Sequence, residues 1–218
     1  MTEKELLIPK HGGYRKLKSF LVAQLVYDVT VRFCELFVDR FSRTRDQMVQ
    51  AARSGVQNVA EGSQASATSK KTELKLTNVA RASLEELRLD YEDFLRQRGL
   101  PVLAPEHPVL GRFKKKRCTT LKEVQEWIAE ERANTDAQGQ AQTNTDKGGD
   151  RSSVTVRESP CQSMSSAALA ANAALSLLNL ACHFLERQIV SQAESFEKEG
   201  GFTERLYRVR SARRRNDQ

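Results

Sequence analysis

The side chains that could act as bases, nucleophiles or metal ligands are scattered along this sequence. The three histidines, His11, His107 and His183, lie far apart, and none has a second ligand at the spacing of a metal site. His183 follows Cys182 directly, but adjacent helix positions point about 100° apart, so the two cannot serve as base and nucleophile. We therefore assign the histidines structural or surface roles and expect no metal.

The cysteines and carboxylates also lack a catalytic arrangement. Cys34, Cys118, Cys161 and Cys182 form neither a CxxC pair nor a cluster with histidine. Neither a zinc site nor a disulfide framework is predicted, and free thiols fit a reducing cytoplasm best. Glu85 and Glu86 would diverge on a helix, and the sequence has no glycine-rich phosphate loop. We expect no enzyme activity, no catalytic residue and no cofactor.

Basic side chains are the remaining candidates for function. Lys and Arg number 35 against 28 Asp and Glu, which gives a net charge of +7 and an isoelectric point near 9.4. This balance favours polyanionic partners such as RNA, DNA or an acidic protein face. Tyr14 and Tyr207 lie among basic residues, where they could stack on bases. The alternative for each patch is that its charges only solvate helix ends and termini.

The candidate residues for binding nucleic acid or a protein partner come from several separate parts of the sequence. They are Arg15, Lys16, Lys18, Arg40, Arg43, Arg45, Lys70, Lys71, Arg81, Arg88, Lys114, Lys115, Lys116, Arg117, Arg208, Arg210, Arg213, Arg214 and Arg215.

The elements that would position these residues are helices, because Gly and Pro are few, at 11 and 5, in a chain rich in helix formers. From Tyr14 to Phe41, apolar residues recur at helical spacing on two faces. One stripe comprises Leu17, Leu21, Gln24, Asp28, Val31, Cys34, Val38 and Phe41, and the other Val22, Val26, Val29, Phe33 and Leu36. We expect one face to meet its own bundle and the other a neighbouring subunit. The alternative is a central helix within a larger monomer.

Two further helices should follow. The first spans residues 47–62, with Asp46 as its N-cap. Ser69 should cap the next helix, whose apolar residues recur at steps of three and four until Gly99 ends it. Small residues of the helix over 47–62 would let another helix approach closely: Ala51, Ala52, Ser54, Gly55, Ala60 and Gly62.

The fold class we predict is all-α, an antiparallel four-helix bundle of long helices whose fourth helix is supplied after a flexible linker. Thr120 and Glu123 predict a capping box at the start of a short helix. The expected parts are an N-terminal arm (1–13), helices 1 to 3 of the bundle (14–100), a Pro-rich basic connector with a short helix (101–133), a disordered linker poor in large apolar residues (134–160), a long suffix helix (161–201) and a basic tail (202–218).

No targeting or membrane signal is evident in the sequence. The start, MTEKELLIPKHGG, has acidic residues and no apolar core of signal-peptide length. No run reaches the roughly eighteen apolar residues of a membrane span. We expect a soluble cytoplasmic protein that acts on no membrane and on no small-molecule substrate.

Two stretches, YRKLKSFLVAQLVYDVTVRF and NVAEGSQASATSKKTELKLTNVARASLEEL, carry a resemblance to a known family. Over about residues 14–100 the chain resembles the four-helix-bundle family of bacterial large-subunit ribosomal RNA intervening-sequence proteins. That family also contains the accessory variability determinant of diversity-generating retroelements. Its pattern of Asn, an aliphatic residue, Ala-Glu-Gly, a serine-rich turn and Ser-Leu-x-Glu-Leu is matched by Asn58 to Gly62 and by Ser83 to Leu87.

Two other segments bear on this resemblance. Family members usually carry an aromatic and a further basic residue in the turn, whereas this chain has SQASATSKKTE, basic only at Lys70 and Lys71. The C-terminal segment resembles the suffix domain that follows the bundle in some members.

With no catalytic partner for Glu61, we assign Asn58, Glu61 and Gly62 to a structural turn that ends the second helix.

The resemblance implies a homopentamer without catalysis of its own, and in the retroelement branch it implies binding to a reverse transcriptase and to nucleic acid. We therefore expect a non-catalytic accessory protein that forms a ring-shaped oligomer and binds RNA and a reverse transcriptase. The matched residues leave the retroelement and ribosomal RNA branches both open. The alternative function is a structural or protein-interaction helical bundle that binds no nucleic acid.

Overall fold

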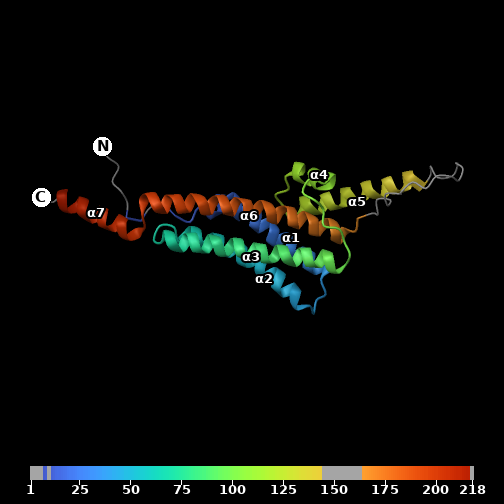
Figure 1. The fold of residues 1–218 in the computed structure, drawn as a ribbon, viewed down its shortest axis with the longest axis horizontal. Helices are drawn as coiled ribbons and strands as arrows, with labels where there is room; N and C mark the ends of the chain where they lie inside the picture. The colour runs from blue at the N-terminus through green and yellow to red at the C-terminus, as the bar shows by residue number, and fades with distance from the viewer. Residues whose placement is uncertain (1–6, 9–10, 144–163, 217–218) are drawn as a thin grey trace. The chain divides into compact units, whose positions relative to one another are not determined.

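The computed structural model describes residues 7–8, 11–143 and 164–216, and every element in them is helical. The predicted all-α class is therefore confirmed for this part of the chain. Cys161 and most of the predicted linker lie outside the described residues. The elements are η1 (Tyr14–Lys16), a 3₁₀ turn, and the helices α1 (Lys18–Phe37), α2 (Arg43–Ala65), α3 (Lys70–Gln97), α4 (Pro108–Lys116), α5 (Leu121–Thr143), α6 (Ser166–Glu199) and α7 (Phe202–Asn216), as Figure 1 shows.

Three helical segments differ from the sequence prediction. The connector contains the additional helix α4, which starts with Pro108 and in which His107 Nδ1 accepts a hydrogen bond from Val109 N at 3.3 Å. α5 continues to Thr143, so the predicted linker is wrong for 134–143, where alanines and glutamines favour a helix. The basic tail is helical as α7.

The described residues divide into two compact units. The first unit comprises Met1–Asp90 and Leu177–Gln218, and the second comprises Tyr91–Ser176. The division falls inside α3 and α6, so each of these helices contributes to both units. It therefore differs from the predicted boundary at residue 100, which follows the end of α3.

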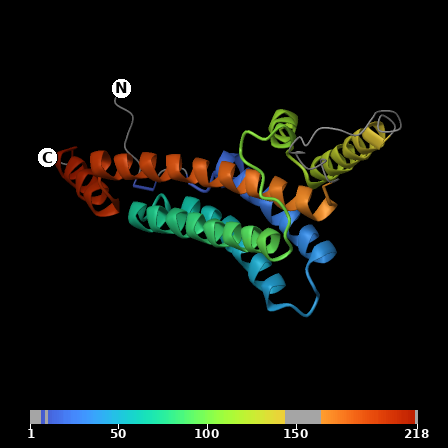
Figure 2. The ribbon, with the colours of Figure 1, turned by 45° about the vertical axis from the view of Figure 1, so that its right-hand side comes forward.

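In the first unit, α1, α2, the first part of α3 and the last part of α6 lie side by side (Figures 1 and 2). The α1 residues Phe20, Ala23, Val26 and Phe33 are all buried and recur at helical spacing, as expected for the apolar face of a core helix. Ser19 of α1 also donates a hydrogen bond to Gln188 Oε1 of α6, at 2.7 Å.

The two predicted stripes of α1 have different environments. In the second stripe Val26, Val29 and Phe33 are buried in the core, whereas Leu36 near the end of α1 is exposed. The first stripe is mostly outside the core, with Leu21 50 % exposed and Gln24 and Asp28 also exposed. Leu21 and Leu36, which are 50 % and 53 % exposed, therefore mark a side of α1 that the first unit leaves uncovered.

Of the N-caps predicted for α2 and α3, the first is wrong and the second is confirmed. α2 begins at Arg43, with Ser42 as its N-cap residue, so the predicted cap, Asp46, lies instead within the first turn. An acidic residue there still interacts favourably with the positive end of the helix dipole. At α3, Thr72 N donates to Ser69 Oγ at 3.1 Å, which confirms the predicted cap.

Polar contacts align α6 with α3 in the first unit. Lys70 Nζ lies 2.6 Å from Glu199 Oε2, and Gln192 Nε2 donates to Glu73 Oε1 at 3.0 Å. One more ion pair joins Arg81 to Glu186, at 3.5 Å. Because residue numbers rise along α3 as they fall along α6, the two helices run antiparallel.

The second unit is organised around α4 and α5, which Figure 2 shows in light green and yellow. Phe113 and Trp127 are both buried, with ring centroids 4.7 Å apart. The predicted capping box of α5 is confirmed, because Thr120 N donates to Glu123 Oε2 at 3.1 Å and Glu123 N donates to Thr120 Oγ1 at 3.3 Å. Asn172 Oδ1 accepts from Leu103 N at 2.8 Å and so fixes the connector.

The long C-terminal helical segment is apolar enough to bear on the prediction that no run reaches the length of a membrane span. Within the described residues, Ser166–Arg215 contains an 18-residue window with a mean hydropathy of 1.5, which is long and apolar enough to cross a membrane. The prediction that no run reaches this length is therefore wrong by this measure. However, 72 % of the window is buried within the protein, and a buried core helix gives the same signal.

Candidate nucleic-acid interface

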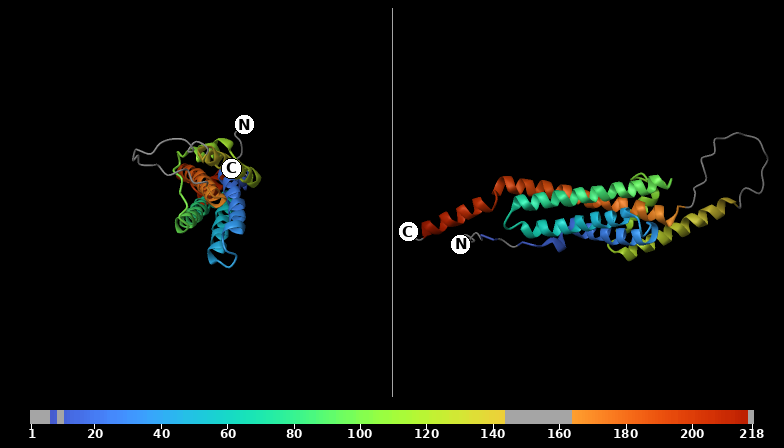
Figure 3. Two further views of the ribbon diagram at one scale, coloured as in Figure 1. Left: turned by 90° about the vertical axis from the view of Figure 1, so that its right-hand side faces the viewer. Right: turned by 90° about the horizontal axis from the view of Figure 1, so that it is seen from below.

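One end of the first unit brings together basic residues that are far apart in the sequence. Gly12 N donates to Ser63 O at 3.2 Å, which places η1 beside the last turn of α2. Arg205 Nη1 donates to Ala67 O at 3.3 Å, which places α7 beside the turn between α2 and α3. Figure 3 shows this turn next to the corner between α6 and α7.

We call this part of the first unit the basic end. Its exposed cations come from η1, the start of α1, the start of α3, and α7: Arg15, Lys16, Lys18, Lys71, Arg208, Arg210, Arg213, Arg214 and Arg215. Tyr14 and Tyr207 belong to the same end, and the Arg15 guanidinium lies 5.4 Å from the Tyr14 ring centroid. Nine of the nineteen predicted binding residues therefore lie at one end of one unit.

The corner between α6 and α7 is built by local interactions. Gly200 has a φ of +72°, a conformation that favours glycine and ends α6. Gly201 N donates to Glu204 Oε2 at 2.9 Å, and this bond caps the start of α7. Arg208 Nη1 then donates to Glu199 O at 3.1 Å, so it satisfies a carbonyl at the end of α6.

Arg205 belongs to the C-terminal basic cluster of the sequence, but the structure gives it a structural role. Its side chain anchors α7, and the residue is only 9 % exposed. Phe202, Leu206 and Val209 share its side of α7 and are partly buried. Their spacing of four and three residues is the signal that could have predicted this docked helix.

Several predicted cations are already engaged by acidic groups. Arg81 pairs with Glu186, and Arg88 with Glu85. Lys70, with a side chain only 12 % exposed, contacts Ser195 as well as Glu199. The hydrogen bond and charge of Lys70 lower the pKa of the Glu199 carboxyl. These three cations therefore have less capacity to bind phosphate than the sequence alone indicates.

The predicted cluster from Lys114 to Arg117 belongs to the second unit. Lys114 Nζ donates to Pro105 O at 2.7 Å, and Lys116 Nζ lies 2.8 Å from Glu130 Oε1. Arg117 has a φ of +51° and follows the end of α4, where it terminates the helix. The cluster is exposed but partly neutralised.

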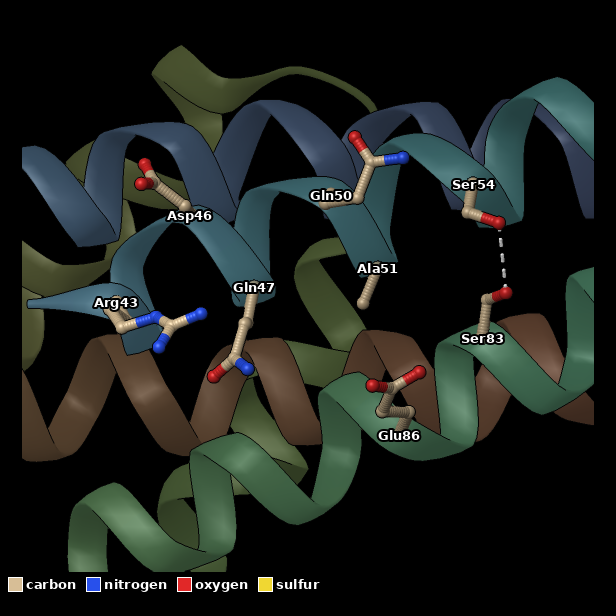
Figure 4. A pocket seen from close by; sticks show the side chains of 8 residues that line it. All are labelled: Arg43, Asp46, Gln47, Gln50, Ala51, Ser54, Ser83 and Glu86. Carbon is tan, nitrogen blue, oxygen red and sulfur yellow. Dashed lines mark hydrogen bonds between the residues drawn. The ribbon is translucent and has the colours of Figure 1, made fainter.

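Arg40, Arg43 and Arg45 lie in and after the turn between α1 and α2, away from the basic end. The Arg40 guanidinium lies 4.5 Å from the ring centroid of Phe41, which is 82 % exposed. Arg43 lines a polar groove of about 470 Å³ between α2 and α3, together with Asp46, Gln47, Gln50, Ala51, Ser54, Ser83 and Glu86 (Figure 4). The hydroxyl oxygens of Ser54 and Ser83 lie 3.0 Å apart and join the two helices there.

The assignment of Asn58, Glu61 and Gly62 to a structural turn is wrong. All three lie inside α2, which continues to Ala65 because the residues after Gly62 also support a helix. Asn58 Nδ2 donates to Ser54 O at 2.9 Å. Glu61 is exposed and lines a groove of about 390 Å³ beside α1 and η1.

Gly62 instead serves close helix packing. It is buried, and a Cβ at this position would lie 3.3 Å from Glu73 O and 3.4 Å from Leu76 Cβ. A Cβ at Gly55 would lie 2.5 Å from Leu84 Cδ2, which is closer still. The prediction that small residues let the third helix approach closely is therefore confirmed.

The thiols of the first unit are poor nucleophiles. Burial raises the pKa of the Cys34 thiol to about 11. Burial also raises the pKa of the Cys182 thiol to about 12, and the nearby Glu85 carboxylate acts in the same direction. Both groups are therefore protonated near neutral pH. In the part of the chain that the structure describes, no group of three or more His, Cys, Asp or Glu side chains could hold a metal ion.

Comparisons of this chain with protein-family models, with curated proteins and with solved structures found no match.

Proposed function

We propose that this protein is a non-catalytic accessory protein that assembles as a ring-shaped oligomer, a pentamer, and binds RNA. The observation that carries the proposal is the basic end of the first unit, where nine exposed cations and two tyrosines gather from four separate segments. Cations neutralise phosphates and aromatic rings stack on bases, so this combination favours a nucleic-acid ligand.

The ring is supported by the uncovered side of α1. Leu21 and Leu36 are 50 % and 53 % exposed, although both lie on stripes at helical spacing. A second copy of the chain would cover these side chains, and a cyclic arrangement would repeat the basic end once per subunit. A modest patch would then form a strong positive belt around the whole assembly.

The family enters this proposal through the resemblance of residues 14–100. We propose that α1, α2, α3 and α6 form an antiparallel four-helix bundle, with α6 supplied after the part of the predicted linker that follows α5. The close approach of α2 and α3 at Gly55 and Gly62 fits such a bundle. We also propose that the chain binds the reverse transcriptase of a diversity-generating retroelement in the cytoplasm. This part of the proposal rests on the resemblance alone.

A second function is favoured by a different observation. Arg81, Arg88, Lys70 and Lys116 all pair with acidic side chains of this chain, so they serve its own structure. A structural or protein-interaction bundle without nucleic-acid binding would need no more than this. The two functions differ in whether the exposed cations of the basic end meet RNA.

A pull-down of the full chain from its native lysate, with and without ribonuclease, separates the two functions. The proposed function predicts that RNA is recovered and that the partner set changes after ribonuclease treatment. Binding of RNA should weaken steeply as salt rises, because it releases counterions from phosphates. Recovery of the same protein partners and no RNA would favour the protein-interaction bundle instead.

A further inference from the structure

We propose that α7 is a platform for an unpaired stretch of RNA, with Tyr207 stacking on a base and Arg210 and Arg214 holding the next phosphates along the strand. This inference rests on the proposed RNA binding and assigns it to one helix and one kind of strand. The first observation is the exposure of Tyr207, which at 75 % is unusual for a large aromatic side chain in a packed unit.

The arrangement of α7 places these side chains together. Tyr207, Arg210 and Arg214 are separated by three and four residues, so they share one face of the helix. All three are exposed. The opposite side holds Arg205 and Phe202, which are buried and partly buried. The tyrosine and its two arginines therefore point away from the docked side of α7.

The charge of α7 fits a polyanion. Residues 202–216 contain six arginines and one acidic residue, Glu204. Arg205 and Arg208 are used to dock the helix. The structure describes no ion pair for Arg210, Arg213, Arg214 or Arg215 with any residue in 7–8, 11–143 or 164–216. These four guanidinium groups are therefore available to phosphates.

The anchoring of α7 gives this platform a fixed position on the first unit. Arg205 contacts the α2–α3 turn at Ala67 O, and Arg208 contacts the end of α6 at Glu199 O. Glu204 caps the helix through Gly201 N. These contacts hold α7 on the first unit, so Tyr207 is presented from an anchored helix.

An unpaired strand fits this surface better than a duplex does. A paired base exposes only its edge, whereas an unpaired base can lay its ring against tyrosine. Arginines three and seven residues along from the tyrosine lie in one direction along the helix, where they can reach successive phosphates on one side of the stacked base. An acidic protein face would use the arginines but would gain little from an exposed aromatic ring among them.

The test measures affinities of the full chain for a labelled RNA strand of about 15 nucleotides without self-complementarity. The same strand annealed to its complement and the DNA strand of equal sequence are measured in parallel. We expect Tyr207→Ala to weaken binding of single-stranded RNA about ten-fold and to change duplex binding less than about two-fold. Tyr207→Phe should retain the affinity, because its ring still stacks.

Phe41→Ala is the matched control, because Phe41 is also an exposed aromatic beside an arginine but lies outside α7. It should leave the affinity for single-stranded RNA unchanged. The double variant Arg210→Gln, Arg214→Gln should lower the salt dependence of single-strand binding by about 1.4 in logarithmic slope.

The failure of this inference is distinct from the failure of the proposed function. If the full chain binds neither single-stranded nor duplex RNA, the proposed RNA binding is wrong and the inference falls with it. If RNA binds but Tyr207→Ala has no effect, or weakens single strands and duplexes equally, the platform on α7 is wrong. Equal losses from Phe41→Ala and Tyr207→Ala would also overturn the assignment to α7. Stronger binding of DNA than of RNA would overturn RNA as the ligand.

Discussion

Gly55 and Gly62 lie on the side of α2 that faces α3, and each removes a Cβ from a tight contact. The contact at Gly55 is with Leu84, a fully buried side chain, whereas that at Gly62 is with a backbone oxygen and Leu76. At the scale of single residues, these absent methyl groups are what let the two helices pack closely.

We predict an order of stability for three alanine substitutions at helical glycines. Gly55→Ala should lower the free energy of unfolding by roughly 1–3 kcal/mol, because its Cβ overlaps Leu84. Gly62→Ala should cost less, since its closest contact is 3.3 Å. Gly111→Ala in α4 is the control, since a Cβ there meets nothing within 4 Å, and it should stabilise by up to about 1 kcal/mol. Urea unfolding measures all three, and equal values for Gly55→Ala and Gly111→Ala would contradict this packing.

At this scale the sequence predicts that the small residues of α2 allow close helix packing, but it places a turn at Gly62 where the helix continues. The two roles are hard to separate by sequence, since glycine is common both at turns and at close helix contacts. Only the partner atoms of α3 distinguish the two roles. The same holds for Arg205, since a sequence does not show that a cation at a basic end is buried against a carbonyl.

At the scale of elements, α7 is held by polar contacts with the α2–α3 turn and with the end of α6. Regular helices were predictable from their apolar spacing, and so were the caps at Ser69 and Thr120. The extension of α5 to Thr143 was not, because residues 134–143 have few large apolar side chains to signal a helix. Their helix relies on backbone propensity, which is a weaker signal.

We predict that the contact between Lys70 and Glu199 makes stability depend on pH. Because the folded pKa of Glu199 lies below its ordinary value of 4.5, the unfolded chain takes up this proton first as pH falls. The contribution is therefore fully present well above pH 4.5 and is lost as pH drops through the folded pKa. Lys70→Gln should reduce this acid sensitivity in urea unfolding measured across pH 3 to 6, in the range of carboxyl titration.

Lys71→Gln is the control for that measurement. It removes a positive charge from the neighbouring position, but Lys71 is exposed and is not in the contact with Glu199. Its stability should follow the pH dependence of the unchanged protein. An equal response from Lys70→Gln and Lys71→Gln would assign the effect to net charge and not to this contact.

We also predict that Arg205→Ala loosens α7 selectively. The variant loses the bond to Ala67 O and the packing of a side chain that is almost wholly buried. Hydrogen exchange of residues 202–216 should become faster, while exchange in α2 and α3 stays unchanged. Arg213→Ala, an exposed position on the same helix, should have no such effect. Protection of α7 equal to that of the unchanged protein would show that Arg205 does not anchor it.

At the scale of the whole molecule, the uncovered side of α1 connects the fold to the proposed ring. If the proposed ring forms through α1, we predict that Leu21→Arg dissociates it without unfolding the chain, since Leu21 is half exposed in the single subunit. Val102→Arg introduces the same charge at a similarly exposed apolar residue of the second unit and should leave the oligomer intact. Sedimentation velocity measures the oligomeric state, and circular dichroism measures whether the chain stays folded. An intact oligomer in Leu21→Arg would remove α1 from the interface.

The most direct test of an RNA-binding ring is the mass of the full chain in solution, measured by light scattering with and without RNA. Five chains of 24.6 kDa each predict a protein mass of about 123 kDa, and the added RNA should elute with it. A particle of 24.6 kDa that elutes apart from the RNA would contradict both the ring and its ligand.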